Sequence, residues 1–113
     1  MIVNHTRDKV IATDYTLCKS IFSKALGLMF SRPKTLVFRF SQEKIIPLHM
    51  FFVFFPIDVI YLDKNVKVVE VVENFKPFSY YRPKKPAQYV VEIPAGSANG
   101  TRAGDKLSLA KYL

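Results

Sequence analysis

The sequence predicts a mainly β protein: a compact, barrel-like single domain over residues 1–113, with about eight short strands and one helix. Three observations support this fold class. Short runs rich in Val, Ile, Phe and Tyr recur along the chain, and polar or Pro-containing turns separate them. Half of the residues are hydrophobic and ten are Phe, which is typical of a folded core. Helical periodicity is found in one stretch only.

The first third of the chain predicts a hairpin, the helix and one strand. Residues 2–4 and 10–13 flank the charged turn 6–9, a spacing typical of a β-hairpin. The helix is expected over residues 16–26, where four apolar residues share one helical face: Leu17, Ile21, Phe22 and Ala25. Residues 35–40 alternate large apolar side chains with Val and Arg, which favours a strand. The polar residues 41–44 are expected to form a turn.

Residues 45–62 are almost entirely apolar and are expected to supply much of the core. Eighteen such residues could span a membrane as a helix. Pro47 and Pro56 argue against this, because each removes a backbone donor and clashes with the preceding helical turn. Asp58 would also carry a charge into hydrocarbon, at a cost of about 3 kcal/mol. Two strands are therefore expected instead, near residues 46–50 and 57–62.

The strand at residues 57–62 carries the most informative pattern. The period of two places Ile57, Val59 and Tyr61 on one face, and Asp58, Ile60 and Leu62 on the other. Because both faces are mostly apolar, the strand is expected to lie inside a sheet that is covered on both sides. Asp58 must then be hydrogen-bonded or paired, since an isolated buried carboxylate is very unfavourable.

The remaining residues predict three further strands. These are expected at residues 66–73, 87–94 and 106–109. A tight turn precedes the first of them, with Asn65 in the left-handed conformation. A Pro-containing loop, residues 75–86, and a turn of small residues, 95–104, separate the others.

Charge and cysteine content narrow the classes of partner and location. The formal net charge of +8 and the pI near 9.7 favour nucleic acid, phosphates or acidic protein surfaces as partners. Cys18 is the only cysteine, which excludes an internal disulfide and a Cys-based metal cluster. Residues 1–3 run directly into polar residues rather than a signal sequence, so a cytoplasmic protein is expected.

Six short motifs follow one another along the chain. In order, they are Gly27-Leu28-Met29, Met50, Pro56-Ile57-Asp58, Leu62-Asp63, Pro86-Ala87-x-Tyr89-Val90-x-Glu92, and Ala95-Gly96 with Gly104-Asp105-x-Leu107. Their order over about residues 10–109 resembles the bacterial and archaeal family catalogued as domain of unknown function 192. The resemblance implies a compact β-rich domain without an established activity. Many relatives have polar residues after the Met, where this chain has Phe51, Phe52 and Val53, so a site built from those polar groups is not supported here.

The leading hypothesis for function is a small, non-catalytic binding or accessory domain. Its candidate pocket combines the centre of the chain with the turn of small residues: His49, Met50, Asp58, Gly96 and Arg102. The backbone amides of such a turn, together with Arg102, could hold a phosphate or a carboxylate. The partner is thus expected to be an anionic ligand or a protein. No catalytic residue, cofactor or metal site is assigned.

Two alternatives remain open. Nucleic acid could bind the loop 75–86, in which cations alternate with aromatic side chains: Lys76, Tyr80, Tyr81, Arg82, Lys84 and Lys85. The aromatic side chains could equally fold back onto the core. An enzyme acting on a small polar substrate could use His49 and Asp58 as a His–carboxylate pair, if the two central strands pair. The same two residues could instead only fix the register of those strands.

Overall fold

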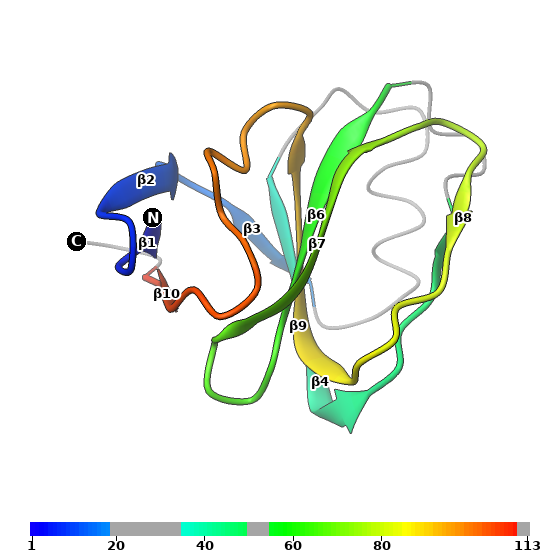
Figure 1. Ribbon diagram of the computed structural model, residues 1–113, viewed down its shortest axis with the longest axis horizontal. Coiled ribbons are helices and arrows are strands. Elements are labelled where there is room, and N and C mark those ends of the chain that lie inside the picture. The colour runs from blue at the N-terminus through cyan, green and yellow to red at the C-terminus, as the bar shows by residue number, and fades with distance from the viewer. Residues whose placement is uncertain (19–34, 50–54, 111–113) are drawn as a thin grey trace.

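The computed structural model describes residues 1–18, 35–49 and 55–110, without the side chain of His49 (Figure 1). This part of the chain contains ten strands and no helix. The strands are β1 (Ile2–Asn4), β2 (Lys9–Ala12), β3 (Thr16–Cys18), β4 (Leu36–Lys44), β5 (Leu48–His49), β6 (Ile57–Leu62), β7 (Val68–Phe75), β8 (Tyr80–Tyr81), β9 (Ala87–Pro94) and β10 (Leu107–Leu109).

A five-stranded sheet with the order β3-β4-β9-β6-β7 forms the centre of the molecule (Figure 1). Neighbouring strands within this sheet run antiparallel, except β3 and β4, which run parallel. A three-stranded sheet, β10-β1-β2, lies on one side of it and the pair β5-β8 lies on the other. The mainly β fold class is confirmed. The expected barrel is not formed by the described strands, because they divide into three separate sheets and none of these closes on itself.

Strand β6 shows why the central sheet is stable. It pairs with β9 on one side and β7 on the other, and all six of its residues are buried. Val59 and Tyr61 pack in one apolar cluster with Leu48 of β5, whereas Ile60 and Leu62 pack in a second cluster with Ile2 of β1. Burying each such side chain stabilises the fold by about 1.5–3 kcal/mol. The predicted two-faced strand is therefore confirmed.

Two expectations for the first half of the chain are wrong. Residues 16–18 are not helical but form β3, where Thr16 N donates to Thr35 O at 3.1 Å and Leu17 is exposed rather than on a buried face. The rest of the expected helix lies outside the described residues. Residues 41–44 are not a turn but belong to β4, where the register with β9 shifts between Arg39 and Lys44, so these exposed polar residues lie in an irregularity of the strand. Strand β5 pairs with β8 and not with β6.

The turn after β6 differs in detail from the expected one. The left-handed residue is Val66, with φ of 61°, and not Asn65. The Asp63 side chain explains the shift: its Oδ1 accepts hydrogen bonds from Asn65 N at 2.8 Å and from Lys67 N at 3.0 Å. These bonds close the turn around Asp63, and Val66 takes the strained position. The predicted loop 75–86 also contains the short strand β8.

Candidate functional site

An open hollow of about 570 Å³ lies where two segments far apart in sequence meet. The first segment is the turn between β1 and β2, and the second is the connection between β9 and β10. They contribute the lining residues Thr6, Arg7 and Lys9, and Asn99, Gly100 and Arg102. Three of the six lining residues are cationic. We call this feature the basic hollow.

The two segments meet because β1 is the middle strand of the three-stranded sheet. It pairs with β2 through Asn4 opposite Lys9, and with β10 through Asn4 opposite Leu107. The turn after β1 is thereby held against the residues that precede β10. His5 N donates to Lys106 O at 2.9 Å, and Lys106 N donates to Thr6 Oγ1 at 2.8 Å, which fixes this junction further.

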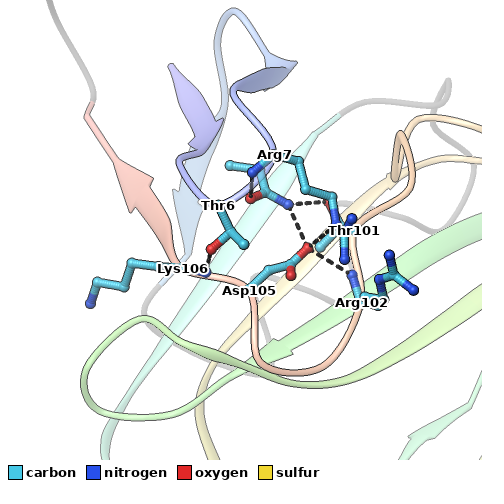
Figure 2. A network of polar contacts seen from close by, with 7 residues as sticks. Thr6, Arg7, Thr101, Arg102, Asp105 and Lys106 are labelled. Atoms are coloured by element: carbon cyan, nitrogen blue, oxygen red, sulfur yellow. Dashed lines mark hydrogen bonds and ion pairs between the residues drawn. The ribbon is translucent and has the colours of Figure 1, made fainter.

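A buried carboxylate, Asp105, organises the junction (Figure 2). Asp105 is 3% exposed, and its Oδ2 accepts three hydrogen bonds. The donors are Asn4 Nδ2 at 2.9 Å, Arg7 Nε at 2.6 Å and Arg102 N at 3.1 Å. Figure 2 shows that Arg7 and Arg102 approach this carboxylate from different segments. Asp105 therefore fixes the guanidinium of Arg7 and the backbone at Arg102, two of the three cationic residues that line the basic hollow.

The electrostatics of Asp105 keep it ionised. Burial acts to raise its pKa, but the hydrogen bonds from Asn4, Arg7 and the Arg102 amide, with the charge of Arg7, outweigh burial and lower the pKa below its ordinary value. The negative charge compensates part of the charge on Arg7. Lys9 and Arg102 have exposed side chains, and the structure shows no ion pair for either among the described residues. The carboxylate nearest to Lys9 in sequence is that of the exposed Asp8.

A second buried carboxylate, Asp58, shapes the turn that leads into the basic hollow. Its Oδ2 accepts hydrogen bonds from Gly96 N at 2.9 Å and Ala98 N at 3.1 Å, and its Oδ1 accepts one from Asn74 N at 2.8 Å. The turn then continues through Asn99 and Gly100, with φ of 56° and 80°. Both values lie in the left-handed region, which Gly adopts freely and Asn tolerates. The expectation that Asp58 is hydrogen-bonded is confirmed.

The predicted pocket is brought together only in part. The carboxylate of Asp58 accepts a hydrogen bond from the backbone amide of Gly96, so these two predicted site residues are in contact. Asp58 does not line the basic hollow. Arg102 does line it. The side chain of His49 and the whole of Met50 lie outside the described residues. The strand pairing on which a His49–Asp58 pair depended is not formed, since β5 pairs with β8.

The loop 75–86 divides its aromatic side chains between core and surface. Tyr81 turns inward: its ring centroid lies 6.3 Å from that of Tyr61, and its hydroxyl donates to Glu70 Oε2 at 2.6 Å. Tyr80, the preceding residue, is exposed. The four cations of the loop are also exposed: Lys76, Arg82, Lys84 and Lys85. The folding-back alternative is therefore right for Tyr81 and wrong for Tyr80.

Sequence reasoning did not assign Thr6, Arg7 or Lys9 to a site, and it included Asn99 and Gly100 only as part of the turn of small residues. The available signal was the clustering of charge in a hairpin turn, a position where charge is ordinary. Nothing local shows that this turn meets Arg102, because the meeting depends on the pairing of β1 with β10.

Within residues 1–18, 35–49 and 55–110, no helix has the length and apolar character needed to cross a bilayer. No group of three or more His, Cys, Asp or Glu side chains there is placed to hold a metal ion.

Comparison with known proteins gives the family. The model of the family DUF192, described as Uncharacterized ACR, matches residues 2–109. A UPF0127 protein of Pyrococcus horikoshii is 38% identical over 95% of this chain and 96% of its own length. A UPF0127 protein of Pyrococcus furiosus is 36% identical over 94% of this chain and 95% of its own length.

A solved structure shares the fold. It is the crystal structure of a "putative transcription regulator" from Sinorhizobium meliloti 1021, with a TM-score of 0.82 and 22% sequence identity over 95% of this chain and 88% of that chain. At this identity the likeness shows the fold alone. Because the family model spans nearly all of the sequence and both archaeal relatives align over almost their entire length, the chain belongs to the uncharacterised family DUF192.

Proposed function

We propose that the protein is a non-catalytic binding module that holds a small anion, a phosphate or a carboxylate, in the basic hollow. One observation carries the proposal: Arg7, Lys9 and Arg102 converge on one hollow although they come from opposite ends of the chain. The buried Asp105 behind them holds Arg7 and the Arg102 backbone in place without an anion. A site built in advance loses little conformational entropy when its ligand binds.

The expected affinity is weak for a single ion. A hydrogen bond to a charged group contributes about 1.5–3 kcal/mol, and an open, solvated site lies at the lower end of this range. Three such contacts sum to about 4.5 kcal/mol, and a dissociation constant of about 1 mM corresponds to about 4.1 kcal/mol. Removing one contact should therefore weaken binding about tenfold.

The experiment is a titration with inorganic phosphate at constant ionic strength, followed by amide chemical shifts. In the wild type, we expect saturable shifts at Gly100 and Arg102. Arg102→Gln should weaken binding about tenfold. The matched control is Arg82→Gln, which removes the same charge from an exposed position in the loop 75–86 and should leave the affinity unchanged. Equal affinity in Arg102→Gln and Arg82→Gln would contradict the proposal, because the attraction would then be a property of the net charge.

We further propose that the 113 residues form one domain and that the protein acts in the cytoplasm. The family match over residues 2–109 supports the first point. The presence of a single cysteine, which leaves no disulfide to require an oxidising compartment, supports the second. Fractionation of cells that express the tagged protein tests the location.

A further inference from the structure

A second basic surface lies in the loop 75–86, and it differs from the hollow in chemistry. Phe78 and Tyr80 are exposed by 57% and 61%, among the most exposed large hydrophobic side chains in the described residues. Four exposed cations surround them in sequence. We call this the β8 surface, made of Lys76, Phe78, Tyr80, Arg82, Lys84 and Lys85.

Pairing of β8 with β5 fixes the backbone of the β8 surface. Tyr80 and Tyr81 pair with His49 and Leu48 of β5, so the alternation of a strand sends one tyrosine outward and the other inward. The inward Tyr81 packs against Phe75, with ring centroids 6.5 Å apart, and bonds to Glu70. The aromatic side chain on the outside is therefore presented by a fixed backbone.

Glu70 anchors the other half of the surface. Its Oε1 accepts hydrogen bonds from Lys84 N at 2.6 Å and Lys85 N at 3.1 Å, while its Oε2 accepts the Tyr81 hydroxyl. Because these bonds use the backbone amides, the ammonium groups of both lysines remain available to solvent. The carboxylate of Glu70 thus fixes the hydroxyl of Tyr81 and the backbone at Lys84 and Lys85, and it leaves the two lysine ammonium groups exposed.

The geometry points to single-stranded nucleic acid as the occupant: we propose that the β8 surface binds it by stacking bases on Tyr80 and Phe78 and by holding phosphates with the surrounding cations. Unpaired bases offer flat faces that stack on aromatic side chains, and cations track the backbone between them. A membrane is the weaker match, because only two large apolar side chains are exposed here and one carries a hydroxyl group. Glu70 and the exposed Glu73 of β7 are the carboxylates nearest in sequence.

This surface is separate from the basic hollow. Figure 1 shows β8 on one side of the five-stranded sheet and the β1–β2–β10 sheet, which carries the hollow, on the other. Variants of one surface leave the other intact. The two proposals therefore succeed or fail independently.

The experiment measures fluorescence anisotropy of a labelled oligo-dT of about twelve nucleotides, at about 50 and about 150 mM salt, with full-length protein. The wild type is expected to bind in the micromolar range and to lose affinity with salt. Tyr80→Ala should weaken binding about tenfold or more, and Tyr80→Trp, which keeps a stacking ring, should retain it. The double variant Lys84→Gln/Lys85→Gln should weaken binding and lower the salt slope by about 1.4.

The matched control is Lys64→Gln/Lys67→Gln, which removes two exposed charges from the turn between β6 and β7. Its binding should equal that of the wild type. Thermal unfolding confirms that each variant is folded. Equal losses in the two double variants, with no effect of Tyr80→Ala, would show attraction by net charge alone and overturn the proposal. Tighter binding to anionic vesicles than to oligo-dT, lost in Tyr80→Ala, would overturn it in favour of a membrane surface.

Discussion

Replacing Asp105 by Asn tests whether one carboxylate builds the basic hollow. The side chain keeps its size, but its Oδ2 loses the charge to which Asn4, Arg7 and Arg102 donate. A hydrogen bond to a charged group contributes about 1.5–3 kcal/mol, against about 1 kcal/mol for a neutral pair. Weakening three bonds by about 0.5–2 kcal/mol each predicts a loss of about 1.5–6 kcal/mol in the free energy of unfolding at pH 7.

The pH dependence provides an independent check of the same reasoning. The pKa of Asp105 is lower in the folded protein than the ordinary value of about 3.9 expected when unfolded. Its charge therefore stabilises the fold fully above that ordinary pKa, and the contribution is lost as the pH falls through the lowered, folded value. Asp105→Asn lacks this contribution at every pH. The difference in stability between wild type and variant should thus be largest near neutral pH and shrink below about pH 4.

Urea unfolding at a series of pH values measures both effects. Asp8→Asn is the matched control, since Asp8 is exposed in the turn between β1 and β2, next to Arg7, and Asn tolerates its positive φ of 55°. The control should change stability by less than about 0.5 kcal/mol. The reasoning is refuted if Asp105→Asn stays within that range at pH 7, or if its deficit is the same at pH 7 and in acid.

Three further substitutions test other polar contacts of the fold. Asp58→Asn should lower the free energy of unfolding by about 2–4 kcal/mol in urea, because three backbone amides lose a charged acceptor; an unchanged midpoint would show that these bonds contribute nothing. Tyr61→Phe should cost about 1–3 kcal/mol, since Ile46 O loses its buried donor at 3.1 Å; equal stability would mean that water replaces the hydroxyl. Glu70→Gln should speed hydrogen exchange at the amides of Lys84 and Lys85, and unchanged exchange would show that the loop is ordered by other contacts.

The strands that the sequence predicts best are those whose own side chains define them. Residues 57–62 and 87–94 were expected with the bounds that β6 and β9 have, because dense apolar runs between turn residues leave little freedom. The need to satisfy Asp58 followed from its position in such a run. The helix prediction failed at residues 16–18 because an apolar residue at helical spacing is also compatible with a short strand. Only pairing with the neighbouring β4 decides between helix and strand there.

The candidate site was less predictable, for a physical reason. A hollow formed by two segments depends on which strands pair, and pairing between distant strands leaves no local pattern in either one. Arg102 was identified from its own turn, but Arg7 and Lys9 become relevant only once β1 lies between β2 and β10. The exposed Tyr80 and the half-buried Tyr81 were also indistinguishable until the register with β5 was known.

The position of β1 between its two partners also sets the order in which the molecule can fold. Ile2 pairs with Leu109, so β1 must close a loop of about a hundred residues before it finds β10. Strands β6 and β7 form a hairpin and need no such search, and sequence-distant pairings slow folding. A nascent chain therefore carries β1 and β2 as a marginal two-stranded unit until residues 107–109 emerge. The basic hollow depends on this long-range pairing, so we expect it to form late and binding there to report that folding is complete.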